Sequence, residues 1–329
     1  MARRVRALGG GGAPVLRRHH RARRDPPGDR PQPHHRLGFA SHPSDRRPPV
    51  NEVKQTGTVN VAADRADRSV DSPVSEDLLL RVQDRVAVLT IDREKKHNAL
   101  TPGIWADLRD TLAELEQDPE VRAVVLTGAG DRSFSAGGDI ESFAAVHTLS
   151  DQQAFIRSCM LTFGAIEDST LPVIAAVNGW ALGGGMELAL ACDIVVAAEN
   201  ALFGIPEAAI GLVPGFGMVR GPQVLGRHWT KYLTLTGFRI DAAKAEKLGL
   251  VQEVAPVGGV VGRAVEIGRA IAANAPLAVS VGKSYVNRGR DQGDFATTNQ
   301  AVSMLHATQD AKEGFAAFLE KRPPEFHGR

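Results

Sequence analysis

Two glycine-rich stretches could present bare backbone to a ligand, because each follows an apolar run. They read SFSAGGD at residues 133–139 and GWALGGGMELAL at residues 179–190. Glycine has no Cβ, so its N–H group can approach a ligand closely. In the second stretch these N–H groups also lie at the predicted start of a helix, where the helix dipole favours negative charge. Two such groups directed at one carbonyl oxygen would make an oxyanion hole, whereas the simpler interpretation is that the glycines only form tight turns.

Two glutamates are placed close to these glycines. Glu187 falls in the first turn of the helix predicted to start near Gly184, and Glu207 follows Pro206, which suits the first position of another helix. A glutamate at a helix start is favourable through the dipole alone. Paired beside an oxyanion hole, however, two carboxyl groups could act as general acid and general base.

Other catalytic and binding motifs do not fit the sequence. SFSAG is not a nucleophile elbow, because Ser133 stands where GxSxG requires its first glycine. GFGMVRG at residues 215–221 spaces its last glycine one residue too far for a dinucleotide-binding GxGxxG. Cys159 and Cys192 lack CxxC spacing, so we expect two buried, reduced thiols. The histidines form no metal-ligand pattern, and we expect no metal site.

The elements that must position these residues alternate between strands and helices. Residues 77–92 predict two short strands, and three further apolar strands are predicted at residues 121–130, 171–179 and 193–200. Such alternation predicts an α/β fold with mainly parallel strand pairing.

A helix is predicted within residues 98–121. Thr101 is a suitable N-cap and Pro102 a suitable first helical residue. Its apolar residues repeat on one face, and they are Ile104, Leu108, Leu112 and Leu115.

Strand patterns stop near residue 258, and the remaining chain predicts helices. Asp310 with Glu313 predicts a capping box at the start of the last helix, and Lys321 and Arg322 are predicted in its last turn. We therefore expect an α/β core over residues 76–258 and a helical C-terminal subdomain, suited to oligomerisation, over residues 259–329.

Residues 1–75 differ from the rest of the chain in composition. Residues 1–50 hold 12 arginines, three aspartates and neither lysine nor glutamate, a net charge of +9, whereas the rest of the chain carries −8. An Arg- and Pro-rich segment without hydrophobic periodicity cannot bury enough apolar surface to offset its ordering entropy, so we expect a disordered basic extension. It could bind RNA phosphates or be a non-essential extension. Because Phe39 is its only aromatic residue, we expect no nucleic-acid partner.

Membrane and export signals are not apparent in the sequence. No apolar run approaches the ~20 residues that cross a bilayer, and no secretory apolar region follows the N-terminal arginines. We expect a cytoplasmic protein without a membrane partner.

The motifs taken together resemble those of the enoyl-CoA hydratase/isomerase (crotonase) superfamily, and most closely an enoyl-CoA hydratase. The resemblance covers roughly residues 77–329. Its signatures, in chain order, are HNAL (97–100), VVLTGAG (124–130), FSAGGDI (134–140), the long stretch from PVIAAVNG to GLVPG (172–215), LTGFRIDAAKAEKLGLVQEV (235–254) and EGFAAFLEKRPPEF (313–326). Few families share so many short signatures in this order.

This resemblance implies a spiral of repeated ββα units with a helical C-terminal subdomain, assembled as trimers or dimers of trimers. It implies an acyl-CoA thioester substrate, so coenzyme A belongs to the substrate and we expect no separate cofactor. The thioester oxygen would be held by the N–H groups of Gly138 and Gly184. The positions that would bind coenzyme A are Ala99, Ala136, Asp139 and Lys321, although Lys321 could instead only neutralise a helix end.

The resemblance also assigns Glu187 and Glu207 as the catalytic glutamates. In hydratases both hold one water: Glu187 would take its proton as it attacks C3, and Glu207 would supply a proton to C2. Isomerases manage with one carboxylate, usually at the Glu207 position, so having both favours hydration. The alternatives are an isomerase and a carnitinyl-CoA dehydratase-like lyase. The chain departs from the family pattern after Pro214, where GFGMVRGPQVLG replaces the usual double glycine, and this leaves the acyl preference open.

Overall fold

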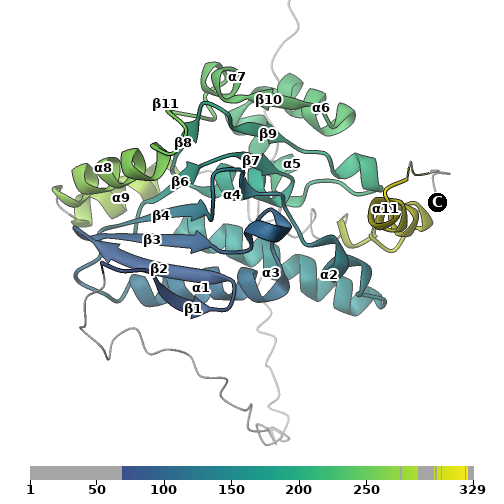
Figure 1. Ribbon diagram of the computed structural model, residues 1–329, viewed down its shortest axis with the longest axis horizontal. Coiled ribbons are helices and arrows are strands. Elements are labelled where there is room, and N and C mark those ends of the chain that lie inside the picture. Colours follow the sequence, from purple (N-terminus) through teal and green to yellow (C-terminus); the bar gives the residue numbers. More distant parts are fainter. Residues whose placement is uncertain are drawn as a thin grey trace, which may run out of the picture. The chain divides into compact units, whose positions relative to one another are not determined.

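The computed structural model describes residues 69–287 except 275, and residues 300–324 except 301, 305 and 323. Its strands form two sheets (Figure 1). The larger sheet has the order β1-β2-β3-β4-β6-β8-β11, with bounds β1 (Ser72–Ser75), β2 (Leu78–Gln83), β3 (Val86–Ile91), β4 (Ala123–Gly128), β6 (Val173–Val177), β8 (Ile194–Ala198) and β11 (Glu253–Ala255). The smaller sheet has the order β10-β9-β7-β5, with bounds β5 (Ser133–Ser135), β7 (Trp180–Leu182), β9 (Leu202–Gly204) and β10 (Arg239–Asp241).

Helices follow most pairs of strands. The α-helices are α1 (Pro102–Leu115), α2 (Ile140–Ala144), α3 (Leu149–Asp168), α4 (Gly184–Ala191), α5 (Gly215–Val224), α6 (Gly226–Thr236), α7 (Ala242–Lys247), α8 (Val260–Ala272), α9 (Pro276–Val286) and α11 (Gln309–Glu320). Two short 3₁₀ helices are η1 (Glu94–Lys96) and η2 (Glu207–Ile210). The helix predicted after residue 98 is confirmed as α1, where Thr101 Oγ1 accepts a hydrogen bond from the Ile104 N–H group (3.3 Å).

The chain repeats a β–β–helix unit. In the pairs β4–β5, β6–β7 and β8–β9, the first strand joins the larger sheet and the second joins the smaller one. From β3 onward the strands of the larger sheet pair in parallel, while β1, β2 and β3 are antiparallel. The predicted α/β fold of repeated ββα units is therefore confirmed. The smaller sheet was not predicted from the strand pattern, because three-residue strands are too short to show alternation.

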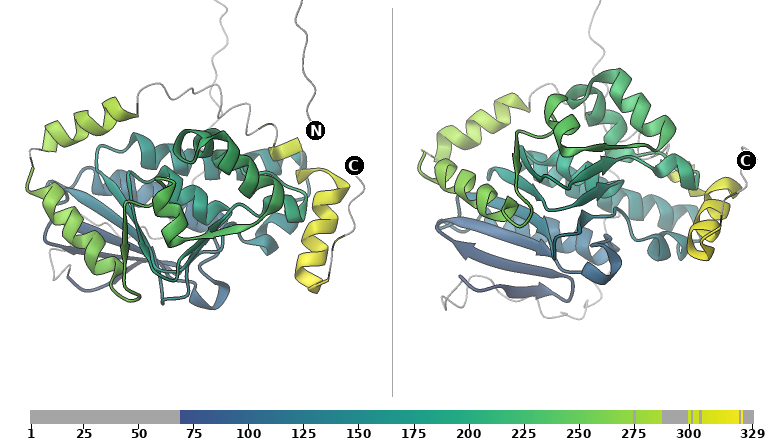
Figure 2. Two further views of the ribbon diagram at one scale, coloured as in Figure 1. Left: turned by 90° about the horizontal axis from the view of Figure 1, so that it is seen from above. Right: turned by 45° about the horizontal axis from the view of Figure 1, so that its top comes forward.

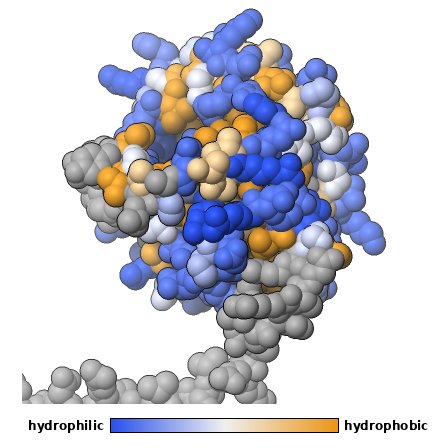
Figure 3. Space-filling view, turned by 90° about the vertical axis from the view of Figure 1, so that its left-hand side faces the viewer, coloured by the Kyte–Doolittle hydropathy of each residue, from blue (hydrophilic) through white to orange (hydrophobic). Residues whose placement is uncertain are grey.

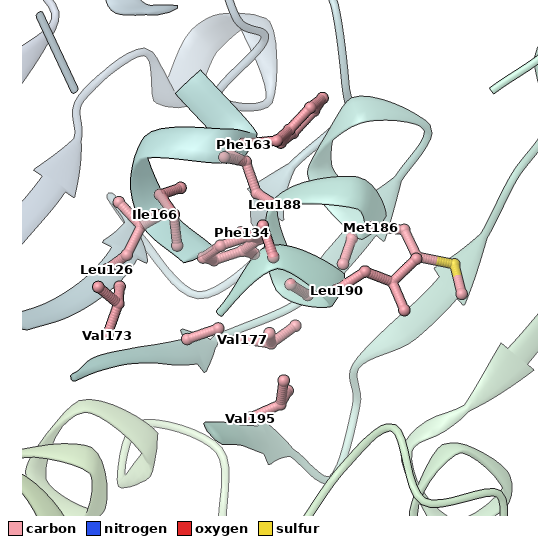
Figure 4. Packing of buried hydrophobic residues seen from close by; sticks show 14 of the residues in the cluster. Leu126, Phe134, Phe163, Ile166, Val173, Val177, Met186, Leu188, Leu190 and Val195 are labelled. Atoms are coloured by element: carbon pink, nitrogen blue, oxygen red, sulfur yellow. The ribbon is translucent and has the colours of Figure 1, made fainter. Parts of the chain in front are cut away.

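Both faces of the larger sheet are covered, as its continuous apolar strands predict. Val125 of β4 and Ile174 of β6 pack against α8 on one face. Their neighbours Val124 and Val173 point to the opposite face, where α3 and α4 lie. Figure 4 shows this second face around α4, with labelled side chains Leu126, Phe134, Phe163, Ile166, Val173, Val177, Met186, Leu188, Leu190 and Val195.

The described C-terminal helices pack on different parts of the core. Helix α8 packs on β4 and β6, whereas α11 packs on α2 and η2. Figure 2 shows α8 and α9 at one end of the molecule and α11 at the other. On the side where α8 and α9 lie, hydrophobic residues are interspersed among hydrophilic ones (Figure 3). Arg263 of α8, for example, forms ion pairs with Glu253 (2.6 Å) and Glu266 (2.8 Å).

The start of α11 differs from the prediction. Thr308, not Asp310, is its N-cap, and Thr308 Oγ1 accepts a hydrogen bond from the Ala311 N–H group (3.1 Å). Glu313 instead pairs with Arg322. The helix ends at Glu320, so Lys321 and Arg322 follow it rather than forming its last turn. The capping-box prediction was wrong because a threonine two residues earlier provides the same type of acceptor.

The ordered core begins before the predicted boundary at residue 76. Strand β1 pairs with β2, and its Val74 packs against the main hydrophobic core. The expected disorder of residues 1–68 lies outside the described residues. Among the described helices, none combines the length and apolarity needed to span a membrane.

Candidate active site

The loop around HNAL lies beside the loop around FSAGGD. The Ala136 N–H group donates to the His97 carbonyl (2.9 Å), and the Leu100 N–H group donates to the Gly137 carbonyl (2.8 Å). The Asp139 N–H group then donates to the Leu100 carbonyl (3.0 Å). These bonds bring the backbone of the predicted coenzyme A positions into one surface.

Arg93 holds two of those positions in place. Its Nη1 donates to Asp139 Oδ2 (2.9 Å) and to the Ala99 carbonyl (2.8 Å). Asp139 Oδ1 also accepts the Ser142 N–H group (2.9 Å) and thereby caps α2. Burial raises the pKa of Asp139, but the hydrogen bonds from Ser142 and Arg93 outweigh it and hold that pKa below its usual value. The Asp139 carboxylate is thus committed to protein partners.

The two glycine-rich turns meet backbone to backbone. A Cβ on Gly137 (φ 97°) would lie 2.7 Å from the Leu182 carbonyl oxygen and 3.1 Å from the Gly184 nitrogen. A Cβ on Gly184 would lie 3.5 Å from the Gly138 nitrogen. Among the described residues, neither the Gly138 nor the Gly184 N–H group donates to a backbone carbonyl. Gly184 is the first residue of α4, where N–H groups have no partner inside the helix. The two predicted oxyanion donors are therefore neighbours with hydrogen-bonding capacity left.

The neighbouring glycines have separate structural reasons. Gly183 precedes α4 with φ 53° and ψ −126°, a conformation that residues with a Cβ avoid. A Cβ on Gly185 would overlap the carbonyl oxygen of Ser135 in β5. The three consecutive glycines thus allow a sharp turn into α4 and a close approach between α4 and the smaller sheet.

Glu187 points from the first turn of α4 to the start of α5. Its Oε1 accepts the Gly217 N–H group (2.8 Å), and the backbone of Phe216 also hydrogen-bonds to it. The side chain is buried, and this burial raises the pKa of Glu187 to about 7 against the lowering effect of the two hydrogen bonds. The stretch after Pro214 that departs from the family pattern therefore provides the donors for Glu187. Sequence reasoning gave no role to Gly217, which is the third residue of α5.

Glu207 occupies a different environment. It opens η2, and Pro206 is the N-cap of this four-residue 3₁₀ helix, so the prediction that Pro206 begins a helix was wrong. Glu207 Oε1 lies 3.0 Å from where a Cβ on Gly183 would be, against the turn before α4. Its Oε2 is buried and has no hydrogen-bond partner among the described residues. Burial and the negative charge of Glu187 raise the pKa of Glu207 well above its usual value.

Lys321 does not contact the two glutamates or the two glycines in the described part of the chain. It is exposed beyond α11 with φ 54°, and no contact among the described residues links its side chain to the two glutamates or the two glycines. Cys159 is buried and Cys192 half-buried, and burial raises the pKa of both thiols. No group of three or more His, Cys, Asp or Glu side chains that could hold a metal occurs in the described part of the chain.

Comparison with known proteins gives a consistent result. The family model of enoyl-CoA hydratase/isomerase matches residues 81–329. A short-chain-enoyl-CoA hydratase of Clostridium acetobutylicum is 40% identical over 253 residues, which cover 75% of this chain and 96% of that protein. A crotonyl-CoA hydratase of Syntrophomonas wolfei is 40% identical over 257 residues, which cover 76% of this chain and 98% of that protein.

A solved structure supports the same relationship. The crystal structure of a carnitinyl-CoA hydratase from Mycobacterium avium matches with a TM-score of 0.69 and 38% identity, covering 78% of this chain and all of that one. Sequence and fold agree over the region that carries Gly138, Gly184, Glu187 and Glu207. This chain belongs to the enoyl-CoA hydratase/isomerase family.

Proposed function

We propose that this protein is an enoyl-CoA hydratase, which adds water across the 2,3 double bond of a 2-enoyl-CoA thioester. One observation carries the proposal: the buried carboxyl group of Glu187 and the half-buried Glu207, whose Oε2 has no partner among the described residues, lie beside two adjacent backbone N–H groups. Pairs of carboxyl groups whose surroundings differ are typical of acid–base catalysis. Relatives that are 40% identical carry names of enoyl-CoA and crotonyl-CoA hydratases.

In this proposal the N–H groups of Gly138 and Gly184 bind the thioester oxygen. Negative charge develops on that oxygen as the substrate becomes an enolate, so donors fixed in advance stabilise the transition state more than the ground state. Gly184 adds the positive end of α4 to this site.

The two glutamates divide the proton transfers. The Glu187 carboxylate, supported by the N–H groups at the start of α5, takes a proton from water as the water oxygen bonds to C3. The π electrons of the double bond move to C2 and the thioester, and neutral Glu207 then gives its proton to C2. Transfer of one proton from Glu187 back to Glu207 restores the starting state. The roles follow from the surroundings: Glu187 has donors that favour its ionised form, whereas burial and the Glu187 charge keep Glu207 protonated.

The remaining parts of the proposal concern substrate binding and assembly. The backbone at Ala99, Ala136 and Asp139 would bind coenzyme A, and Lys321 would reach its phosphates. Because coenzyme A belongs to the substrate, the reaction needs no separate cofactor. We propose a homotrimer or a dimer of trimers.

The test is an assay of the purified protein with 2-enoyl-CoA thioesters of different length and branching, followed by loss of the conjugated thioester absorbance. Glu187→Gln and Glu207→Gln should each lower hydration by about 10²–10⁴-fold, because Gln keeps the shape of Glu but cannot exchange a proton. Glu120→Gln, a change at an exposed carboxyl group in the loop before β4, is the matched control and should keep full activity.

An isomerase would behave differently in the same variants. Moving a proton between C2 and C4 of a 3-enoyl-CoA needs only one base, so Glu187→Gln would spare this reaction and Glu207→Gln would abolish it. If the wild type rearranges 3-enoyl-CoA much faster than it hydrates any 2-enoyl-CoA, the hydratase proposal fails.

A second candidate is a carnitinyl-CoA dehydratase. Two Mycobacterium avium structures named carnitinyl-CoA hydratase and carnitinyl-CoA dehydratase are 38% and 40% identical to this chain. This reaction uses the same addition or loss of water, so the glutamate variants would affect it equally. Including carnitinyl-CoA in the substrate panel separates the two candidates by relative kcat/KM.

A further inference from the structure

The backbone donor that reaches Glu187 belongs to a helix of low intrinsic stability. Helix α5 has the sequence GFGMVRGPQV, and glycine and proline are the two poorest helix formers. Pro222 also removes the N–H group that would donate to the Met218 carbonyl inside the helix. The N-cap, Pro214, provides no side-chain acceptor for the first turn. The place of the Gly217 N–H group, which donates to Glu187 Oε1 (2.8 Å), therefore depends on how α5 is attached to its neighbours.

A buried ion pair attaches α5 to α3. Arg220 Nε donates to Glu167 Oε1 (2.6 Å), and Arg220 Nη2 donates to Glu167 Oε2 (3.0 Å). Arg220 is 4% exposed and Glu167 is 9% exposed. Two parallel hydrogen bonds between a planar guanidinium and a carboxylate fix the orientation of both groups as well as their distance. Arg220 follows Gly217 by three residues, so the two residues lie on the same side of α5.

Packing around this ion pair extends to the first turn of α5. The central carbon of the Arg220 guanidinium lies 5.8 Å from the centroid of the Phe216 ring. The Phe216 ring centroid lies 4.8 Å from that of Phe163 in α3, and both side chains are buried. Because Phe216 directly precedes Gly217, a shift of Arg220 would disturb the contact that holds the residue next to the donor.

The α3 end of the ion pair is held by the region of α9. Glu167 lies in the last turn of α3, and Asn287 Nδ2 donates to its backbone carbonyl (2.9 Å). Lys283 Nζ of α9 donates to the Ile166 carbonyl (2.9 Å) and to the Leu171 carbonyl (2.9 Å). A carboxylate near the C-terminus of a helix is disfavoured by the helix dipole. Glu167 therefore does not stabilise α3 through the dipole, whereas its partner on α5 explains its position.

The ionisable groups that face Glu187 come from three elements. Burial, with the Glu187 charge, raises the pKa of the Cys159 thiol in α3 and of Glu207 in η2. From α5 comes Arg220, whose charge is balanced by Glu167. The strands β5, β6 and β7, which also pack near α4, carry no ionisable side chain. Because the ion pair is neutral as a whole, we expect it to affect Glu187 through the position of α5.

We propose that Arg220 is a positioning residue for the general base: its paired hydrogen bonds to Glu167 fix α5 on α3 and thereby hold the Gly217 N–H group against Glu187. This inference rests on the proposed function, because it needs Glu187 to act as the base. Arg220 is assigned no contact with the substrate and acts through the backbone of α5.

The expected consequence is a shift of the pH profile. Glu187 must be ionised to take a proton from water, and a hydrogen bond to its carboxylate favours this form. When Arg220 no longer holds α5, the bond from Gly217 weakens and the pKa of Glu187 rises. Loss of a hydrogen bond to a charged group should move the acidic limb of kcat/KM up by about one pH unit. Below that limb, kcat/KM then falls by about tenfold.

The test replaces the ion pair by apolar residues in the full-length chain. Arg220→Met combined with Glu167→Leu leaves no uncompensated buried charge, and such replacements often preserve or raise stability. We expect this double variant to fold and to show the upward shift of its acidic limb. The matched control is Arg263→Met with Glu253→Leu, which removes an exposed pair with the same two parallel bonds (2.6 and 3.0 Å). The control should keep the wild-type profile.

A second readout follows Glu187 without turnover. A protonated carboxyl group has an infrared C=O stretching band that disappears when the group ionises, and the band of Glu187 is the one missing from Glu187→Gln. In wild type this band should titrate near pH 7, because burial raises the pKa of Glu187 to about 7. The midpoint should move up by about one pH unit in the double variant and stay unchanged in the control.

The outcomes separate this inference from the function on which it rests. If the wild type hydrates no enoyl-CoA, the proposed function fails, while the infrared titration still tests the attachment of α5. If the double variant is folded by thermal unfolding and keeps the wild-type infrared midpoint, the positioning role of Arg220 is overturned even if the wild type is a hydratase.

A more conservative variant decides the question if the double variant does not fold. Arg220→Lys keeps the positive charge beside Glu167 but lacks the planar fork that makes two parallel hydrogen bonds. Its acidic limb and its infrared midpoint should still move to higher pH. Wild-type values of both in folded Arg220→Lys would overturn the proposal.

Discussion

At the scale of single residues, the site depends on two identical side chains in unequal surroundings. Glu187 is met by the N–H groups at the start of α5, while Glu207 Oε2 has no partner among the described residues and is affected by the charge of Glu187. Burial alone would make both groups weak acids. In the proposed mechanism, the backbone donors at Gly217 and Phe216 favour the ionised form of Glu187, which can then accept the proton of water.

The raised pKa of Glu187 predicts a pH-dependent effect on stability. Its pKa in the folded state is about 7, above the ordinary value of 4.5, so between these values the folded protein binds more protons and loses stability as the pH rises. Glu187→Gln removes this cost. We expect the variant to be more stable than wild type at pH 8, by up to about 3 kcal/mol, and the difference to shrink towards pH 4.5.

Denaturant unfolding of both proteins at pH 5 and pH 8 measures this difference. Glu120→Gln provides the matched control, with the same small change at both pH values. A stabilisation by Glu187→Gln that is equal at pH 5 and pH 8 would show that the Glu187 carboxyl group does not resist ionisation in the fold.

The two glutamates should also behave as one unit in catalysis. If Glu187 and Glu207 act on the same water and substrate, the double Gln variant should lose much less activity than the product of the two single losses, because residues that work together are not additive. Measured kcat/KM values for the three variants test this. Multiplicative losses would mean that the two carboxyl groups act in independent steps.

At the scale of elements, the glycine turn before α4 connects β7 of the smaller sheet to the helix that carries Glu187. Gly185 lets α4 approach the backbone of β5, and Gly183 turns the chain from β7 into α4. Glycine in a helix costs about 1 kcal/mol relative to alanine. At Gly185 any larger residue would cost more, because its Cβ would overlap the Ser135 carbonyl oxygen.

This close approach predicts opposite effects for two Gly→Ala variants. At Gly185 a methyl group would overlap the Ser135 carbonyl, so Gly185→Ala should lower the free energy of unfolding by more than about 3 kcal/mol or prevent folding. At Gly262 in α8 a Cβ would meet no atom within 4 Å, so Gly262→Ala should stabilise the protein by about 0.5–1 kcal/mol. Urea unfolding measures both. Equal effects in the two variants would contradict the close contact between α4 and β5.

At the scale of the whole molecule, the described site lies within one continuous body from β1 to α11. The earliest element in it is β1, whose Val74 packs against the core, and the site residues lie at or after Ala99.

The effect of shortening the chain from its N-terminus should therefore change abruptly once β1 is removed. A chain starting at Ser69 should keep the activity and thermal stability of the full-length protein. A chain starting at Asp77 loses β1 and leaves β2 at the edge of the sheet, so its melting temperature should fall, by about 2–4 °C for each kcal/mol lost. Thermal melts and hydration assays of both chains measure this. A large loss of activity in the chain from Ser69 would show that the basic segment takes part in function.

Assembly should be visible in solution. The C-terminal helices leave large apolar side chains exposed, including Val286 at 85% and Phe318 at 58%, as helices that take part in subunit contacts do. We expect sedimentation at micromolar concentration to show a trimer or hexamer. A stable monomer would contradict the proposed assembly.

The main helices and strands were predictable from the amino-acid pattern, because they are long and periodic. The stripe from Ile104 to Leu115 marks α1, Thr101 marks its start, and the apolar runs mark β4, β6 and β8. The glycine-rich stretches and the two glutamates near helix starts indicated a possible site, and the family resemblance then assigned Glu187, Glu207, Gly138 and Gly184 to it.

The different surroundings of Glu187 and Glu207, and the contacts that hold them, depend on how distant parts of the chain pack together. The strands of the smaller sheet are too short to show a pattern, and Gly217 donates to Glu187 across 30 residues of chain. The rings of His306 and Phe143 pack together although they are more than 160 residues apart in the sequence, so no local spacing could connect them. Thr308 rather than Asp310 caps α11, because local signals offered two acceptors of the same kind. Burial, which separates an ordinary glutamate from one with a pKa near 7, depends on packing from all sides and is set only when the chain has folded.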